Sequence, residues 1–325
     1  MSRVSIVVLV LVAVGAAVWF LGPREPVSGP TGFDPERIGA DLDAYLYEQE
    51  RDIPNIRRGT QKHVLWADPV GKGRTPLSVV YVHGFSASLE EIRPVPDNVA
   101  RALGANVFYT RLTGHGRDGA AMAEATALDW RADMEEALEI GRRIGERVIV
   151  MGTSTGGTLA ALALAEGAPN VAGVVMVSPN FEIVAEGAQM LTWPFARQFV
   201  PLVAGRERFF APENAAHGRW WTTRYPTVAV LPMAALVKAA RAAAVETIEV
   251  PALFVFADAD RVVSAERTRR VAARWGGPVT LWPVDLGPED DRVAHVVAGD
   301  ILSPGQTASV TERILEWVRE RDLAR

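Results

Sequence analysis

The stretch "GTSTGG", from Gly152 to Gly157, places a serine between small residues where an apolar run gives way to an alanine- and leucine-rich tract. The pattern G-x-S-x-G predicts a sharp turn from a buried strand into a helix, with the Ser154 hydroxyl held above the sheet. We expect glycine at 152 and 156 because side chains there would make strand and helix collide. Ser154 is therefore a candidate nucleophile. The alternative is a glycine-rich turn in which this serine only caps the helix.

A serine hydroxyl is a weak nucleophile, so it needs a neighbouring base and an acid that orients this base. His295, in "EDDRVAHVVAGD", follows the last predicted strand and precedes the last predicted helix. Asp260 comes just after the predicted strand 252–257, at the sheet edge where ligand groups gather in open α/β sheets. We predict His295 as the base and Asp260 as its acid, with Asp258 as the competing acid. The chain order Ser154, Asp260, His295 is the one expected for a nucleophile on such a turn.

A tetrahedral intermediate also needs hydrogen-bond donors for its oxyanion. We expect these to be the backbone N–H of Thr155, directly after the candidate nucleophile, and that of Phe85 in the loop "HGFSAS". His83 in the same loop and His115 in "RLTGHGRD" are interpreted as structural residues. The predicted site therefore consists of three side chains and two backbone amides.

Composition and spacing argue against several other chemistries. Cysteine is absent, which removes thiolate catalysis and cysteine-based metal sites. No two histidines have i, i+4 spacing, and His63 and His217 have no partners at a useful spacing, so we expect no metal. No glycine-rich nucleotide-binding motif is present, so we expect no nucleotide cofactor. A net charge of −5 without basic runs argues against a nucleic-acid partner.

The predicted elements that would position these residues alternate between strands and helices. Near-continuous Val and Ile runs separated by helices indicate a mostly parallel sheet covered by helices on both faces, which is the α/β class. The predicted strands lie at 78–84, 106–112, 147–151, 171–178, 252–257 and 279–284. The predicted helices lie within 34–50, 98–104, 126–145, 157–166 and 303–318.

Capping residues predict where the first and last of these helices begin. Asp34 followed by Pro35 is a typical N-cap with proline at the first helical position, so we expect one helix over 34–50. Ser303 and Gln306 have the spacing of a capping box at the start of the last helix. The apolar stripe of that helix consists of Val310, Ile314, Trp317 and Val318.

The segment 182–249 contains no convincing buried strand, and a structureless loop of this size is improbable. We predict that it is a helical lid inserted after the predicted strand 171–178, which corresponds to strand six of the complete fold, between the core regions 34–181 and 250–325. Its aromatic residues suggest an apolar wall for a substrate, or else only the core of the lid itself. They are Trp193, Phe195, Phe199, Phe209, Phe210, Trp220, Trp221 and Tyr225.

The N-terminal run "VSIVVLVLVAVGAAVWFL", Val4 to Leu21, is 18 residues long and carries no charge. As a helix it would span roughly 27 Å, close to the hydrocarbon thickness of a bilayer. We predict that residues 1–22 form a membrane anchor, with the N-terminus cytoplasmic and the rest extracytoplasmic because Arg3 precedes the run. The alternatives are a cleaved signal peptide, which would leave a secreted or periplasmic protein, and a buried core helix. Residues 23–33, rich in proline and glycine, are expected to be a linker.

These motifs resemble the α/β-hydrolase superfamily, and most of all its carboxylesterase and monoacylglycerol-lipase branch. The resemblance is carried by "VYVHGFSAS", "RLTGHG", "GTSTGG", "PALFVFADADRVV" and the His295 loop. It covers about residues 60–325, apart from the middle of the insertion. Two departures are Ala257, where the family has a small glycine, and threonine on both sides of Ser154.

The resemblance implies a Ser–Asp–His triad, acyl-enzyme chemistry and a lid over an acyl pocket. The expected function is hydrolysis of a small-molecule carboxylic ester with an apolar acyl or aryl group, by a protein that meets the membrane through its N-terminal helix. The same triad would also suit an amide, thioester or carbon–carbon hydrolase. A third interpretation is a membrane-tethered binding protein without turnover.

Overall fold

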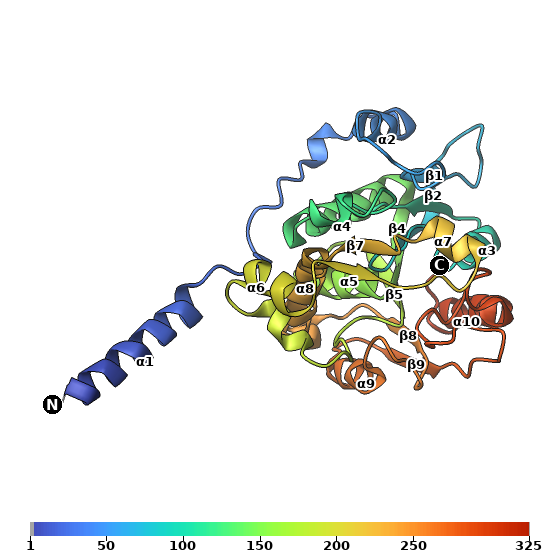
Figure 1. The fold of residues 1–325 in the computed structure, drawn as a ribbon. Helices are drawn as coiled ribbons and strands as arrows, with labels where there is room; N and C mark the ends of the chain where they lie inside the picture. The colour runs from blue at the N-terminus through green and yellow to red at the C-terminus, as the bar shows by residue number, and fades with distance from the viewer. Residues whose placement is uncertain (1–2, 325) are drawn as a thin grey trace.

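A seven-stranded sheet forms the centre of the protein in this computed structural model, which describes residues 3–324 (Figure 1). The strand order is β1-β3-β2-β4-β5-β8-β9, and every neighbouring pair is parallel except β1 with β3. The prediction of an α/β fold with a mostly parallel sheet is therefore confirmed. The strands of this sheet are β1 (His63–Leu65), β2 (Thr75–Val82), β3 (Asn106–Tyr109), β4 (Gly145–Thr153), β5 (Val171–Val177), β8 (Ala252–Phe256) and β9 (Val279–Pro283).

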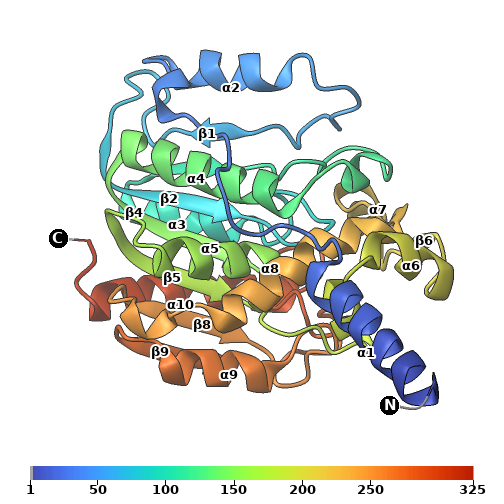
Figure 2. The same ribbon diagram turned by 90° about the vertical axis from the view of Figure 1, so that its left-hand side faces the viewer.

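Helices cover both faces of this sheet, as the Val- and Ile-rich strands require. One face packs against α4, α5, α8 and α9, and the other against α3 and α10 (Figure 2). The helices are α1 (Arg3–Leu21), α2 (Leu42–Glu50), α3 (Val95–Leu103), α4 (Ala127–Ile144), α5 (Thr155–Ala165), α6 (Ala196–Val203), α7 (Ala215–Trp220), α8 (Val230–Ala242), α9 (Ala265–Arg274) and α10 (Thr307–Glu320).

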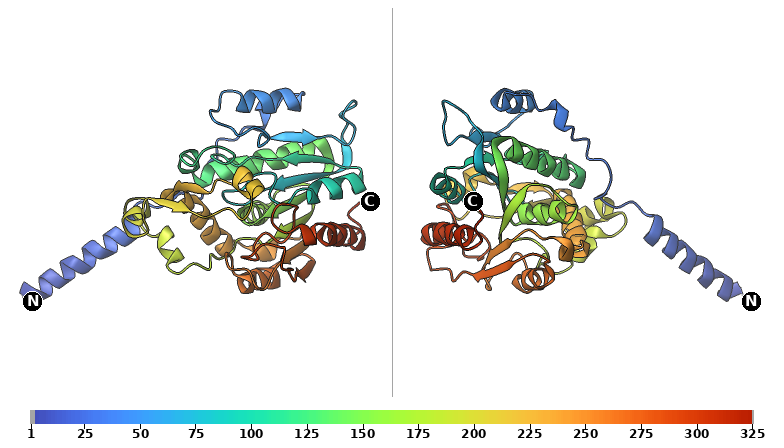
Figure 3. Two further views of the ribbon diagram at one scale, coloured as in Figure 1. Left: turned by 45° about the vertical axis from the view of Figure 1, so that its right-hand side comes forward. Right: turned by 180° about the vertical axis from the view of Figure 1, so that it is seen from behind.

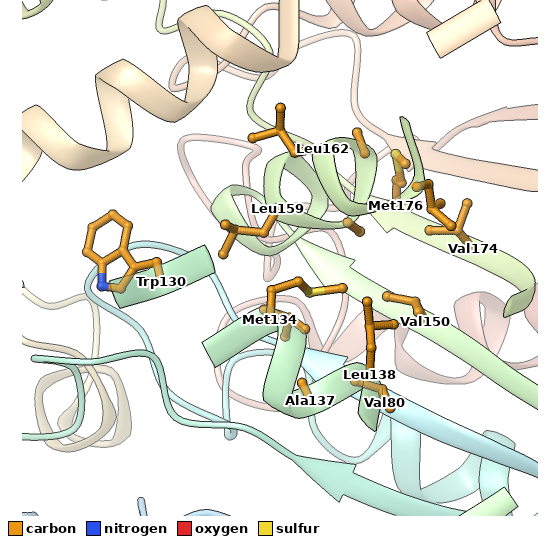
Figure 4. Close-up of a cluster of buried hydrophobic side chains, with 14 of the residues drawn as sticks. Val80, Trp130, Met134, Ala137, Leu138, Val150, Leu159, Leu162, Val174 and Met176 are labelled. Carbon is orange, nitrogen blue, oxygen red and sulfur yellow. The ribbon is translucent and has the colours of Figure 1, made fainter. Parts of the chain in front are cut away.

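The larger core fixes the position of strand β4, which ends just before Ser154. Met134 and Leu138 of α4 lie over Val80 of β2 and Val150 of β4, and Leu159 of α5 joins the same cluster (Figure 4). All five side chains are buried, so strand β4 and helix α5 are held by apolar packing on either side of the turn between them. That turn is consequently a rigid support for a functional side chain.

Two helix starts differ from the sequence prediction. Asp34 does accept a hydrogen bond from the Glu36 N–H, but it begins only a 3-10 turn, Pro35–Arg37. Helix α2 begins later because Asp41 is a second N-cap, whose side chain accepts from the Ala44 N–H. The continuous helix over 34–50 was therefore wrong at its first turns.

The predicted capping box of the last helix was also wrong. The Ser303 hydroxyl donates to the Val296 carbonyl and accepts from the Asp291 N–H, so it is not available as a cap. A 3-10 turn, Pro304–Gln306, follows, and α10 begins without a side-chain cap. The predicted apolar stripe is confirmed, since Val310, Ile314, Trp317 and Val318 are all buried.

The segment between β5 and β8 contains α6, α7 and α8, together with a pair of short strands that the sequence did not predict. These are β6 (Glu207–Phe209) and β7 (Arg224–Pro226), which pair antiparallel. Helix α8 packs on α5. Strand β6 is fully exposed, so it lacks the buried apolar pattern by which a strand is recognised.

Helix α1 projects away from the body and has no buried residue (Figure 3). It is long and apolar enough to cross a membrane, with a mean hydropathy of 2.9. Met1 and Ser2, the first residues of the predicted anchor, lie outside the described residues.

The predicted linker that follows α1 lies along the body through specific contacts. The Glu25 carboxylate pairs with Arg197 of α6 at 2.9 Å and accepts from the Ala127 N–H, where α4 begins, at 3.1 Å. Arg131 donates to the Val27 carbonyl at 2.6 Å. We call residues 23–33 the strap, because both α4 and α6 hold them in place.

Candidate active site

Ser154 lies at the corner between β4 and α5 in a conformation that few L-residues adopt. Its φ is 50° and its ψ is −111°, a region outside the ordinary minima that persists only where the surroundings impose it. A Cβ at position 156 would lie 2.0 Å from the Val82 carbonyl oxygen, and one at position 152 would lie 2.6 Å from the carbonyl carbon of Gly156. The predicted steric need for glycine on both sides of Ser154 is therefore confirmed.

Backbone hydrogen bonds hold this corner while its hydroxyl makes no cap. The Ser154 N–H donates to the Val177 carbonyl at 2.9 Å, and the Ser154 carbonyl accepts from Asn180 at 3.0 Å and Thr158 at 3.1 Å. The side chain makes no capping hydrogen bond to α5, so the alternative of a helix-capping serine was wrong. The positive end of the α5 dipole begins at this residue, which favours negative charge beside it.

The structure brings Asp260 and His295 together, although they are far apart in the chain. Asp260 Oδ2 accepts from His295 Nδ1 at 2.9 Å, while its Oδ1 accepts from the Val262 N–H at 2.8 Å and the Val263 N–H at 3.0 Å. The Asp260 side chain is only 1% exposed. Since Nδ1 donates to this carboxylate, Nε2 is the nitrogen left to accept a proton.

The competing acid, Asp258, lies elsewhere. Its side chain is 62% exposed and pairs with Arg269 at 2.8 Å on the surface. The side chains of residues 258 and 260 leave the end of β8 in different directions, and only that of Asp260 reaches His295. Geometry thus separates two aspartates that the sequence left as alternatives.

Opposing effects act on the charge of His295. Burial alone would lower the pKa of this imidazole, but the charge and hydrogen bond of Asp260 outweigh it, with help from Glu91 and Asp291. The net effect is a raised pKa. A raised pKa means a stronger base, which suits a group that must accept the proton of a serine hydroxyl.

Ser154 and Gly299, four residues after His295, border the same loop, the one between β2 and α3. A Cβ on Gly84 would lie 3.1 Å from Ser154 Cβ, and a Cβ on Gly299 would lie 2.6 Å from Ile92 Cα. The structure contains no direct hydrogen bond between Ser154 Oγ and His295 Nε2. Such bonds are often long in unliganded hydrolases and tighten when a substrate binds.

Two buried histidines support the loop that carries Phe85. His83 bridges two loops, because its Nδ1 bonds the Gly84 carbonyl at 2.9 Å and its Nε2 accepts from the Leu112 N–H at 3.2 Å. Burial lowers the pKa of His83 to about 4, and it holds the pKa of His115 well below the usual range. Both rings are therefore neutral near pH 7, which fits the structural role predicted for them.

The Phe85 loop also contacts the segment 182–249. The Thr222 N–H donates to the Ser86 carbonyl at 2.7 Å, and the Phe85 ring packs edge-on against Tyr225 at 5.2 Å. Met122 and Ala229 complete an apolar cluster beside these rings. The segment therefore lies directly over the candidate oxyanion loop, and Ser154 itself is only 5% exposed.

The two remaining histidines lie outside this arrangement. His63 stacks on Tyr109 at 5.2 Å, and His217 packs against Trp221 at 4.7 Å. Within residues 3–324, no three His, Asp or Glu side chains are grouped so that they could hold a metal ion.

Two buried carboxylates at the site were not predicted from the sequence. Asp291 Oδ2 accepts from the N–H groups of His295 at 2.9 Å and Val296 at 2.7 Å, which fixes the loop of the candidate base. Glu91 lies beside Gly84 and acts on the charge of His295. The only available signal was an acidic pair at each place, "EE" at 90–91 and "DD" at 290–291, with nothing to say that Glu91 and Asp291 are the members that act on the site.

Comparison with known proteins places this arrangement among hydrolases. The family model described as "serine aminopeptidase, S33" (Hydrolase_4) matches residues 73–280, which is more than half of the chain. A thermostable monoacylglycerol lipase of Bacillus sp. (strain H-257) is 30% identical over 197 residues, covering 61% of this chain and 76% of that protein.

Solved structures share the fold at lower identity. One is from work on the metagenome-derived lipolytic enzymes LipS and LipT, with a TM-score of 0.67, 22% identity, and coverage of 82% of this chain and 100% of that one. Another is the monoacylglycerol lipase of Paleococcus ferrophilus, with a TM-score of 0.57, 16% identity, and coverage of 80% and 98%.

Proposed function

From its membership of the α/β-hydrolase family that the S33 model describes, we propose a specific reaction for this chain. The chain is a carboxylic ester hydrolase of the lipase and esterase type. The proposed reaction is cleavage of esters of apolar acyl or aryl groups through an acyl-enzyme at Ser154. The observation that carries the proposal is the 2.9 Å bond between His295 Nδ1 and Asp260, in a site where a serine occupies a strained strand-to-helix turn. A serine alone would be inert, whereas a serine near an oriented base is a nucleophile.

In the proposed reaction, His295 Nε2 takes the proton of Ser154 Oγ while this oxygen attacks the acyl carbonyl carbon. Asp260 holds the imidazole in the required tautomer and stabilises its charged form. The imidazolium then gives its proton to the leaving alcohol as the ester C–O bond breaks. A water molecule then gives its proton to His295 and attacks the carbonyl carbon of the acyl-enzyme in the same way, which releases the acid and restores Ser154.

The proposed oxyanion hole consists of the backbone N–H groups of Phe85 and Thr155. Thr155 is the first residue of α5, so its N–H has no partner within the helix and lies at the positive end of the dipole. The loop of Phe85 is held by His83 on one side and by Thr222 on the other. Donors fixed in this way need little rearrangement when negative charge develops, which is what makes such a hole effective.

We also propose that residues 182–249 are a lid, inserted between the core regions 34–181 and 250–325, and that their aromatic side chains line the acyl pocket. Tyr225 supports this, since its ring contacts Phe85 beside the proposed oxyanion hole. The name of the Bacillus relative, a monoacylglycerol lipase, is consistent with an apolar acyl chain.

The proposed location is a membrane, with α1 as a single span and the catalytic part on the extracytoplasmic side. Helix α1 has the length, hydropathy and exposure of such a span. Arg3 at its start and Trp19 near its end have the positions expected of a cytoplasmic charge and an interfacial aromatic. Removal of the segment as a signal peptide would instead leave a secreted or periplasmic enzyme.

The test is a series of p-nitrophenyl esters of graded chain length, assayed with the wild-type chain and Ser154→Ala. We expect the wild type to hydrolyse these esters and the variant to lose at least about 10³-fold in kcat, because the nucleophile is gone. A fluorophosphonate should label the wild type and not the variant. Ester hydrolysis that survives in Ser154→Ala would refute the proposed nucleophile, and a wild type that is neither active nor labelled would favour the binding protein.

A second candidate function, amide hydrolysis, has one observation in its favour, because the matching family is described as serine aminopeptidase. Aminoacyl p-nitroanilides assayed beside the esters separate the two. Faster Ser154-dependent cleavage of the anilides would replace the esterase assignment while keeping the triad.

A further inference from the structure

Glu91 is a buried carboxylate in the β2–α3 loop that the proposed mechanism does not use. The residue is 2% exposed. Its Oε2 accepts from the Gly84 N–H at 2.6 Å and from the Tyr81 hydroxyl at 3.2 Å. A buried carboxylate is costly unless something nearby uses its charge or its hydrogen bonds, so its presence here requires an explanation.

The Glu91 carboxylate lies one glycine away from the candidate nucleophile. A Cβ added to Gly84 would be 2.7 Å from Glu91 Oε1 and 3.1 Å from Ser154 Cβ, so Gly84 separates these two side chains. Gly84 also precedes Phe85, whose N–H is the proposed oxyanion donor. A carboxylate that holds the Gly84 N–H therefore fixes the peptide unit leading to that donor.

The same carboxylate acts on the candidate base through its charge. The negative charge of Glu91 favours the charged form of His295, as do those of Asp260 and Asp291. On its other side, Glu91 faces Tyr81 of β2, whose hydroxyl also bonds the Thr153 hydroxyl at 3.2 Å. Burial raises the pKa of Glu91 to about 7, against the opposing effects of the Gly84 N–H and the charge of His295. Its ionisation therefore falls in the pH range in which the enzyme would work.

We propose that Glu91 is a positioning residue of this hydrolase, which anchors the oxyanion loop through Gly84 and, when ionised, stabilises the imidazolium form of His295 from a second direction beside Asp260. The proposal rests on the proposed role of His295 as the base. It adds to the carboxylate bonded to Nδ1 another that acts on the same imidazole through space, as the carboxylate of Asp291 does.

Glu91→Gln separates the two effects, because its amide oxygen still accepts from Gly84 whereas its charge is gone. We expect kcat/KM at its alkaline plateau to fall about three- to tenfold, since a less basic imidazole abstracts the serine proton more slowly. The acidic limb of the kcat/KM profile should move to lower pH, because the pKa of His295 falls when the charge is removed. Glu91→Ala also loses the anchor, so it should be slower still at every pH.

The matched control is Glu90→Gln, the same change on the adjacent residue. Glu90 pairs with Arg93 at 2.8 Å and is not among the main groups that shift the pKa of His295, so its profile should coincide with that of the wild type. A folded Glu91→Gln protein whose acidic limb stays in place, with or without a uniform loss of rate, would overturn the proposal. If the wild type shows no Ser154-dependent hydrolysis at all, the proposed function itself is overturned.

If Glu91→Gln does not fold, Tyr81→Phe provides the test. This variant keeps the ring and removes one donor to the Glu91 carboxylate, so the carboxylate ionises less readily at a given pH. The acidic limb should again move to lower pH, and an unchanged limb would overturn the proposal.

Discussion

At the scale of single residues, the candidate catalytic side chains could be predicted from the sequence, whereas which carboxylates are buried could not. The sequence predicted Ser154, Asp260 and His295 from a turn motif, a strand end and a loop before the last helix, and the structure brings the last two into contact. Asp258 could be set aside only when its surface pair with Arg269 was seen. Glu91 could not be chosen over its neighbour, because the identity of a residue does not state which of two adjacent carboxylates faces inward.

The proposed acid gives a prediction at this scale. Asp260→Asn should lower kcat about 10³- to 10⁴-fold, because an amide favours the wrong imidazole tautomer and cannot stabilise its positive charge. The residual activity should have an acidic limb at lower pH than in the wild type, since the charge that most strongly raises the pKa of His295 is gone. The working form of His295 is neutral, so activity is lost as the pH falls through that pKa. The measurement is a kcat/KM profile from pH 5 to 9.

Asp258→Asn is the control for this variant, because it changes an aspartate two positions away that pairs with Arg269 at the surface. Its activity and pH profile should match those of the wild type. A large loss in Asp258→Asn together with a small one in Asp260→Asn would show that residue 258 is the acid.

At the scale of elements, the order of strands and helices followed from the sequence, whereas several ends did not. Apolar runs specify which segments are buried, and the parallel sheet follows from them. Whether a side chain caps a helix depends on which of several nearby groups forms a hydrogen bond with its hydroxyl or carboxylate. Ser303 bonds Val296 and Asp291 instead of capping α10, and Asp41 restarts the helix that Asp34 was expected to begin. Strands β6 and β7 were missed because each has only three residues, too few for a periodic signal, and β6 has no buried residue.

A buried ion cluster that fastens the region before β1 to α4 gives a prediction about stability. Lys62 Nζ pairs with Glu136 and, at 3.3 Å, with Asp133, and its side chain is 9% exposed. Lys62→Met should lower the free energy of unfolding by about 3–5 kcal/mol, because two buried carboxylates would lose their cation. Denaturant unfolding followed by circular dichroism measures this.

Lys72→Met is the matched control, since that lysine pairs with Asp43 at 2.6 Å in a position where its side chain is 49% exposed. No measurable change in the unfolding midpoint is expected for it. Equal stability of Lys62→Met and the wild type would mean that the cluster contributes nothing to holding the two elements together.

At the scale of the whole molecule, the sequence predicted α1 as an independent apolar helix but not how the chain continues from it. Proline and glycine in 23–33 predicted a linker but not its contacts, because composition indicates how stiff a segment is and not which surfaces it will bind. In the structure, Glu25 contacts both Arg197 and the start of α4. Contacts of this kind depend on surfaces that exist only once the body has folded.

The role proposed for α1 gives the prediction at this scale. Full-length protein should float with phospholipid vesicles in a density gradient, and a chain that lacks residues 1–21 should stay in the aqueous fraction, because the only long exposed apolar helix within the described residues is gone. The truncated chain should hydrolyse p-nitrophenyl acetate within about twofold of the full-length rate, since α1 has no buried residue. A mature protein whose intact mass already lacks the segment would show that it is a signal peptide.

The strap between α1 and the body limits how far an anchored enzyme could reach. A flexible linker would let the catalytic part move through a hemisphere above the bilayer and reach solutes in the water some distance from the membrane. Held by Glu25 and Val27, the catalytic part would instead stay at one height and one tilt, with the same rim always turned toward the lipid. Its search for substrate would then be two-dimensional, and the enzyme would act on molecules dissolved in its own membrane in preference to those in the surrounding water.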